Sequence, residues 1–233
     1  MVIMIVAVFV LVLYVREKIH SYSLKALFLK TAVSFLFVAV GVSGCYIALN
    51  GGHSHPLACF VVFALVFGLL GDIWLDLKYI YPEHDAAYTY AGFAVFGIGH
   101  LLYMTGILLE FGYENILYVI IPYILGTVSS ILVILLGGMM KLDYGKMKVP
   151  VMIYSFFLLS MVFLSGSYAL MYSWNNSVLN MFFAGAVMFS VSDIILSGTY
   201  FGKNRARPVD IILNYTFYYT GQFLIASSLM FLK

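Results

Sequence analysis

Long apolar runs recur along the chain, and short polar or Gly- and Pro-containing stretches separate them. A helix crosses the hydrocarbon core of a bilayer in about 20 residues. Lipid offers no hydrogen-bond partner to an open sheet edge, so each run is predicted to form a helix. The runs cover residues 1–15, 26–49, 56–77, 88–109, 115–139, 149–172, 178–200 and 209–232.

This pattern predicts an all-α membrane bundle of eight transmembrane helices. The first run is the shortest, and its predicted end is the charged triplet Arg16-Glu17-Lys18. Because the apolar runs extend almost from one end of the chain to the other, we expect a single integral membrane domain over residues 1–233.

The basic residues are distributed unevenly over the connections. All but one of the twelve Lys and Arg residues lie in or beside the first, third, fifth and seventh connections. Because Lys and Arg are concentrated in cytoplasmic loops, these connections are predicted to be cytoplasmic and both termini extracytoplasmic. The residues are Arg16, Lys18, Lys25, Lys30, Lys78, Lys141, Lys146, Lys148, Lys203, Arg205 and Arg207, and the exception is Lys233.

The composition agrees with a membrane protein and excludes other classes. Hydrophobic residues make up 64% of the chain and charged residues 9%, whereas a soluble domain has about 25% charged residues. No basic stripe with interleaved aromatic residues is present, so a nucleic-acid partner is not expected. Membrane lipids are the expected surroundings, and in the absence of an organelle signal the expected location is a bacterial plasma membrane.

Two short motifs recur in the two halves of the chain. Gly71-Asp72-Ile73 in the third run resembles Ser192-Asp193-Ile194 in the seventh. Gly99-His100 and Gly221-Gln222 follow them at nearly equal distances, in the fourth and eighth runs. This likeness predicts two parallel four-helix repeats that present their aspartates at similar depth. The predicted repeats cover residues 1–110 and 115–233.

Ionisable side chains inside the runs are the first candidates for function. An Asp inside a span costs about 2.5–3.5 kcal/mol on insertion scales, so Asp72 and Asp193 are functional candidates by default. The alternative is a structural role, in which each Asp bonds to a polar side chain of a neighbouring helix. His100, near mid-membrane, has the same two interpretations. Lys30, at the start of the second run, is first interpreted as an interface anchor.

Polar side chains also share one face of the eighth run. Tyr215, Tyr219 and Gln222 recur at three- and four-residue spacing, so they either contribute to a site or only pack. A metal site needs about three converging ligands. His100 is the only histidine inside a run, so no metal is expected, and any chemistry would depend on the carboxylates.

Four motifs in this order carry a family resemblance. They are Gly71-Asp72-Ile73-Trp74-Leu75, Gly99-His100-Leu101-Leu102-Tyr103, Ser192-Asp193-Ile194-Ile195-Leu196 and Tyr218-Tyr219-Thr220-Gly221-Gln222. Over most of its length the chain resembles the YhhN, or lysoplasmalogenase, family. The family's Lys at the start of the second span matches Lys30, although Thr31 stands where a Pro or small residue is usual.

The resemblance implies hydrolysis of the vinyl ether bond of a lysoplasmalogen, which releases a fatty aldehyde and glycerophospho-ethanolamine or -choline. The two aspartates would form an acid–base pair that requires no metal or other cofactor. Two carboxyl groups in one poorly hydrated pocket are not both charged at low cost, so one is expected to keep a proton. Which of the two does so stays open.

The resemblance also suggests roles for the other matched residues. His100 and Tyr103 would orient water or the head group of the lysophospholipid substrate. Tyr219 and Gln222 would hold Asp193, and Lys30 would meet the lipid phosphate.

Two other classes of function stay open at this point. Paired carboxylates inside a membrane also suit a proton-coupled transporter. A lipid-binding membrane protein without catalytic activity would keep the same fold. The sequence leaves the head-group preference and the oligomeric state open.

Overall fold

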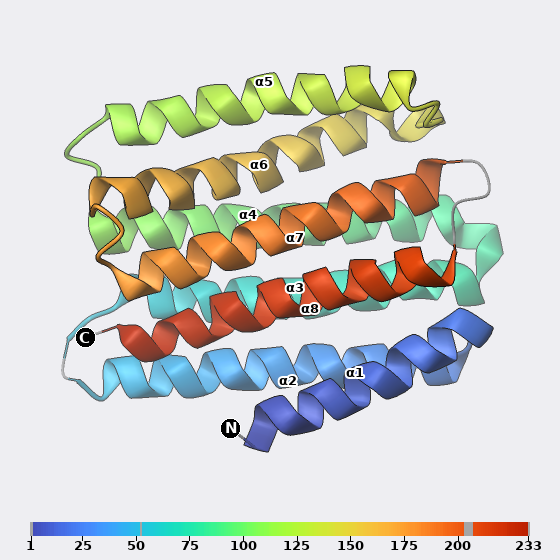
Figure 1. Cartoon of the computed structure of the whole chain (residues 1–233), viewed down its shortest axis with the longest axis horizontal. Helices are drawn as coiled ribbons and strands as arrows, with labels where there is room; N and C mark the ends of the chain where they lie inside the picture. The colour runs from blue at the N-terminus through green and yellow to red at the C-terminus, as the bar shows by residue number, and fades with distance from the viewer. Residues whose placement is uncertain (1, 52, 203–206, 233) are drawn as a thin grey trace.

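The computed structural model describes residues 2–51, 53–202 and 207–232. Within these residues the fold is a bundle of eight α-helices and contains no strand (Figure 1). The helices are α1 (Val2–His20), α2 (Leu24–Leu49), α3 (Pro56–Ile80), α4 (Asp85–Phe111), α5 (Leu117–Met139), α6 (Lys148–Met171), α7 (Ser177–Phe201) and α8 (Pro208–Ser228). Three short 3-10 helices accompany them, at Pro82–His84, Gly145–Met147 and Leu229–Phe231.

The predicted all-α membrane bundle is confirmed. Six of the eight helices, α2 to α7, are long and apolar enough to cross a membrane. These six segments make the chain a multi-pass membrane protein. The orientation of the termini stays a prediction, and Lys203, Arg205 and Lys233, which enter the charge argument, lie outside the described residues.

The first helix is longer than its apolar run. It does not end at Arg16 but continues to His20, and α2 begins after Ser23, whose hydroxyl accepts a hydrogen bond from the Ala26 N–H at 3.2 Å. Lys18 and His20 lie in the last turn of α1, where the helix dipole stabilises positive charge. Lys18 is also only 3% exposed, so the charged end of α1 is part of the packed bundle.

Three close helix pairs organise the bundle: α3 with α4, α5 with α6, and α7 with α8. Helix α2 contacts both α3 and α8, whereas α1 covers the edge formed by α2 and α8 (Figure 1). Helix α5 lies at the opposite edge against α6. We call the end of the bundle that holds the α1–α2, α3–α4, α5–α6 and α7–α8 connections the odd-loop end.

Glycines allow α7 and α8 to approach closely. A Cβ atom placed on Gly185 would lie 2.7 Å from the carbonyl oxygen of Gly221, and one placed on Gly221 would lie 2.9 Å from the Phe189 nitrogen. Small residues permit such backbone contact between membrane helices. This contact fixes the position of α8 beside Phe189, four residues before Asp193.

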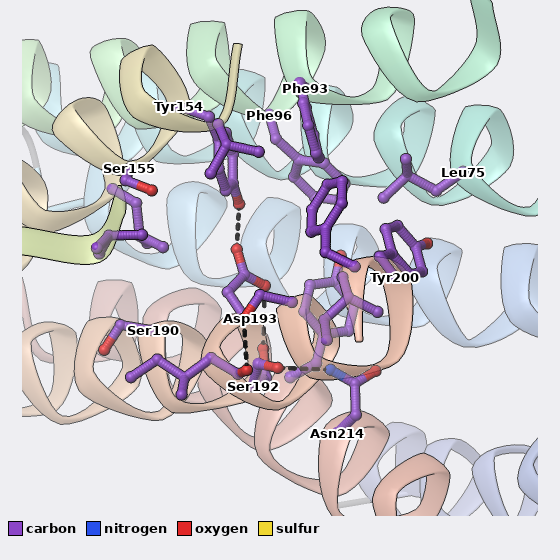
Figure 2. Close-up of a pocket in the computed structure, with 18 of the residues that line it drawn as sticks. Leu75, Phe93, Phe96, Tyr154, Ser155, Ser190, Ser192, Asp193, Tyr200 and Asn214 are labelled. Atoms are coloured by element: carbon purple, nitrogen blue, oxygen red, sulfur yellow. Dashed lines mark hydrogen bonds between the residues drawn. The ribbon is translucent and has the colours of Figure 1, made fainter. Parts of the chain in front are cut away.

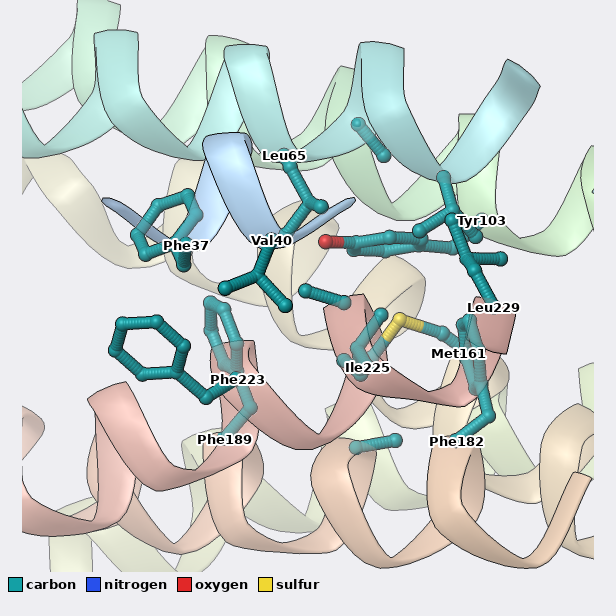
Figure 3. Close-up of a cluster of buried hydrophobic side chains, with 14 of the residues drawn as sticks. Phe37, Val40, Leu65, Tyr103, Met161, Phe182, Phe189, Phe223, Ile225 and Leu229 are labelled. Atoms are coloured by element: carbon teal, nitrogen blue, oxygen red, sulfur yellow. The ribbon is translucent and has the colours of Figure 1, made fainter. Parts of the chain in front are cut away.

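The apolar core closes the bundle beside the candidate site. Phe37 and Val40 from α2 meet Leu65 from α3 and Phe223 and Ile225 from α8 (Figure 3). All five side chains are buried.

Candidate active site

Asp72 and Asp193 occupy equivalent positions in their helices. Asp72 precedes Ile80, the last residue of α3, by eight positions, and Asp193 precedes Phe201, the last residue of α7, by eight positions. At about 1.5 Å per residue, each lies about 12 Å from the odd-loop end of its helix.

Both aspartates line one cavity of about 140 Å³. Its wall is mainly apolar and aromatic (Figure 2). The wall includes Phe93 and Phe96 from α4, Tyr154 and Leu158 from α6, and Tyr215 and Tyr218 from α8. A mainly apolar cavity lined by two carboxyl groups suits acid–base chemistry.

The polar side-chain contacts of Asp193 in the described residues are hydroxyl groups, and only one of them donates to it. The Tyr154 hydroxyl donates a hydrogen bond to Asp193 Oδ2, as Figure 2 shows. Ser192 Oγ lies 3.4 Å from Asp193 Oδ1, but its one proton is used in a shorter, 2.7 Å bond to the Phe189 carbonyl oxygen. Within the described residues, no cationic side chain forms an ion pair with Asp193.

His100 contacts Asp193 only through Tyr154. Its Nε2 lies 3.4 Å from the Tyr154 hydroxyl oxygen. Because the tyrosine proton is directed to Asp193, this oxygen is the acceptor and His100 Nε2 carries the hydrogen. Nδ1 is buried without a partner in the described part of the chain, and because a buried imidazolium without a counter-ion is costly, Nδ1 is the unprotonated nitrogen. His100 is therefore a neutral support for Tyr154.

Asp72, in contrast, has polar partners at both carboxylate oxygens. Ser34 and Tyr218 donate to Asp72 Oδ2 at 2.6 and 2.8 Å. The Lys30 ammonium lies 3.3 Å from Asp72 Oδ1. A carboxylate with this set of partners is stabilised in its charged form.

A second carboxylate extends this network. Asp76 Oδ1 lies 3.2 Å from Lys30 Nζ and 3.0 Å from Lys18 Nζ, and the Tyr14 hydroxyl lies 3.5 Å from Asp76 Oδ2. The four charged groups are at most 4% exposed. We call Lys18, Lys30, Asp72 and Asp76 the four-charge cluster. Its two cations balance its two carboxylates, as the burial of charge requires.

A model of the YhhN family matches residues 25–229. The chain belongs to the YhhN family. This family is known for lysoplasmalogenase-like function. No curated protein and no solved structure matches the chain.

The matched YhhN segment contains both aspartates, but two supporting side chains lie outside it. Tyr14 and Lys18 come from α1, which precedes the segment. Sequence reasoning missed Lys18 as a site residue, because a charged triplet after an apolar run reads as a solvated helix end. It also missed Ser34 and Tyr154, which have no distinguishing signal among the other hydroxyl side chains of the chain.

Lys30 is not the interface anchor that its position in the sequence first suggested. Its side chain is 4% exposed, and its ammonium lies between two carboxylates. These carboxylates balance the buried positive charge of Lys30 inside the YhhN bundle. The ammonium therefore has no need to extend to the membrane interface. A lipid phosphate at this position would have to compete with Asp72 and Asp76.

The polar face of α8 serves Asp72 rather than Asp193. Tyr219 lies 3.2 Å from Ser34 Oγ and donates to the Lys30 carbonyl oxygen at 3.3 Å. Gln222 donates to the Tyr218 hydroxyl at 3.2 Å. The expectation that Tyr219 and Gln222 hold Asp193 is therefore wrong, because this face of α8 is directed at α2 and α3.

The remaining predicted residues lie around the cavity at different depths. Tyr215 lines it and packs edge-on against Tyr14, with ring centroids 4.8 Å apart. Tyr103 donates to Gln222 Oε1 at 3.2 Å, and neither residue is part of the cavity wall. His100 is also behind the wall, so none of these three contacts the cavity directly. In the described part of the chain, no three His, Cys, Asp or Glu side chains are grouped to hold a metal.

Proposed function

We propose that this YhhN protein hydrolyses the vinyl ether bond of lysoplasmalogens, with Asp193 as general acid and Asp72 as the charged base. The observation that carries the proposal is the unequal environment of two carboxyl groups on one intramembrane cavity. Asp72 has an ammonium and two hydroxyl donors, whereas Asp193 has hydroxyl contacts alone. Family membership supports the reaction class.

Vinyl ether hydrolysis needs one acid and one base. Protonation of the alkene carbon remote from the ether oxygen produces an oxocarbenium ion. Water then adds to the carbon that bears the oxygen and loses a proton to the base, which gives a hemiacetal. The hemiacetal then collapses: its hydroxyl gives a proton back to the acid residue, its bond to the glycerol oxygen breaks, and that oxygen takes the proton held by the base. The aldehyde is released and both carboxyl groups return to their starting states.

The charge balance assigns the acid in this proposal. A buried carboxylate without a cation is costly, so Asp193 keeps its proton until a substrate arrives. After the proton moves to the alkene, the Tyr154 hydroxyl stabilises the Asp193 carboxylate. Asp72, which Lys30 keeps ionised before the reaction, faces the oxocarbenium ion across the cavity and then accepts the proton of water.

The size of the cavity suits the reacting part of the lipid. A volume of about 140 Å³ is smaller than the roughly 300–1,000 Å³ of sites that enclose a drug-sized ligand. Ile194 on α7 belongs to the cavity wall and is 64% exposed, so the cavity lies next to the outer surface of the bundle. We infer that the vinyl ether enters sideways from the bilayer while the hydrocarbon tail stays in lipid.

Aldehyde release in D₂O tests this function. Purified protein in mixed micelles is incubated with a lysoplasmalogen, the matched saturated alkyl ether and the matched ester lysolipid. We expect aldehyde from the vinyl ether alone, with one deuterium on the carbon next to the carbonyl, because that carbon receives the acid's proton. Aldehyde incubated without protein measures background exchange. Lysolipid uptake into proteoliposomes without aldehyde would instead identify a transporter.

Tyr154→Phe tests the support of Asp193. The variant keeps the ring in the cavity wall but cannot donate to the Asp193 carboxylate. A hydrogen bond to a charged group is worth about 1.5–3 kcal/mol, so we expect kcat for aldehyde release to fall about 10- to 100-fold. Tyr113→Phe, at a side chain that is 69% exposed, is the matched control. Equal kcat values for the two variants would remove Tyr154 from the mechanism.

A further inference from the structure

Helix α1 lies outside the segment that matches the YhhN family, yet it inserts two side chains into the candidate site. Tyr14 is 0% exposed and Lys18 is 3% exposed. The Lys18 ammonium also lies over the rings of Tyr22 and Tyr79, 4.4 and 4.3 Å from their centroids. These contacts place a second ammonium deep beside Asp76.

Lys18 and Lys30 contact the same oxygen of Asp76, at 3.0 and 3.2 Å. Lys30 also contacts Asp72, at 3.3 Å, so its single charge is shared between two carboxylates. If Lys18 were neutral, Lys30 would be the only ammonium for both carboxylates in the described residues. Coulomb attraction in a buried site is strong, so Asp76 would attract Lys30 more strongly once Lys18 lost its charge. The electrostatic stabilisation that Lys30 gives to Asp72 would then be weaker.

We propose that Lys18 is a positioning residue for catalysis: by holding a second positive charge on Asp76, it leaves Lys30 available to keep Asp72 ionised. This inference rests on the proposed hydrolase function and deepens it. Helix α1 then supplies a charge that the active site requires, in addition to covering the edge of the bundle.

The alternative is that Lys18 only attaches α1 to α3. An attachment role depends on the bond between Lys18 and Asp76, and any variant that breaks this bond would have the same defect. A charge-balancing role depends on the sum of charges in the four-charge cluster. Removal of one charge would then lower the activity, whereas removal of the Lys18 and Asp76 charges together would largely preserve it.

Four variants separate these roles through the kinetics of aldehyde release: Lys18→Met, Lys18→Gln, Lys18→Arg and the double variant Lys18→Met/Asp76→Asn. We expect both neutral single variants to lower kcat at least tenfold with KM within twofold of the wild type. Lys18→Arg keeps the charge and should stay within threefold. The double variant restores the charge balance and should also recover to within threefold of the wild-type kcat.

Lys18→Gln keeps an amide that can donate to Asp76, so it provides a folded neutral variant if Lys18→Met does not assemble. A folded neutral variant with wild-type kcat, or a double variant no faster than Lys18→Gln, would overturn the inference. The wild-type protein is measured beside them. If it releases no aldehyde, the proposed function itself fails, whereas an active wild type with insensitive variants contradicts only the role of Lys18.

Discussion

Asp193→Asn is expected to lower the kcat for aldehyde release by about 10²- to 10⁴-fold, the range that a positioned general acid contributes. Asparagine has nearly the same size and still accepts the hydrogen bond from Tyr154. It has no carboxylic proton to give to the alkene carbon. The loss should therefore appear in the chemical step, with little change in the melting temperature or in KM.

Asp143→Asn is the matched control for this change. Asp143 is exposed in the α5–α6 connection, and its side chain accepts a hydrogen bond from the Gly145 N–H at 3.1 Å, which asparagine retains. We expect wild-type turnover from this variant. If Asp193→Asn retains more than a tenth of the wild-type kcat while Asp143→Asn is unchanged, Asp193 is not the acid, and Asp72 takes that role in a revised mechanism.

The apolar runs were sufficient to predict the helices, because a chain in lipid must satisfy its backbone groups within each segment. The aspartates were predictable for a related reason. A charge inside a span has a cost that composition and position reveal without any knowledge of its neighbours. Asp72 and Asp193 were therefore recognisable from the sequence, and the structure places both on one cavity.

The partners of each aspartate were not predictable, because they depend on how the helices are rotated against one another. The spacing of Tyr219 and Gln222 shows that they share a face of α8, but it does not show whether that face meets α2 or α6. Tyr154 is one of 19 tyrosines. It becomes distinctive only when α6 places its hydroxyl against Asp193.

The burial of Lys18, at the end of α1, could not be predicted from the sequence either. In sequence, Arg16-Glu17-Lys18 is a charged triplet that separates an apolar run from a connection. In the structure the helix continues through it, and the direction of each side chain decides its environment. Glu17 forms a pair with the 72% exposed Lys25, whereas Lys18 points into the bundle towards Asp76. Only the packing of α1 against α2 and α8 distinguishes the two.

Lys30→Met is expected to cause the largest loss of stability among single substitutions in the four-charge cluster. Lys30 is the one ammonium that contacts both Asp72 and Asp76 in the described residues. Its removal leaves two carboxylates, each at most 3% exposed, with Lys18 as the remaining cation of the cluster. Breaking a buried ion pair from one side costs about 3–5 kcal/mol, so the detergent-solubilised protein should unfold at a clearly lower temperature.

Lys25→Met provides the surface comparison for the same chemical change. Its ammonium is 2.8 Å from Glu17, but the side chain is 72% exposed, and exposed pairs contribute about 0–1 kcal/mol. Thermal unfolding of the two variants, followed by circular dichroism, should separate them widely. The double variant Lys30→Met/Asp76→Asn should regain part of the loss, because it removes one uncompensated carboxylate. Equal melting temperatures for Lys30→Met and Lys25→Met would show that the cluster does not stabilise the fold.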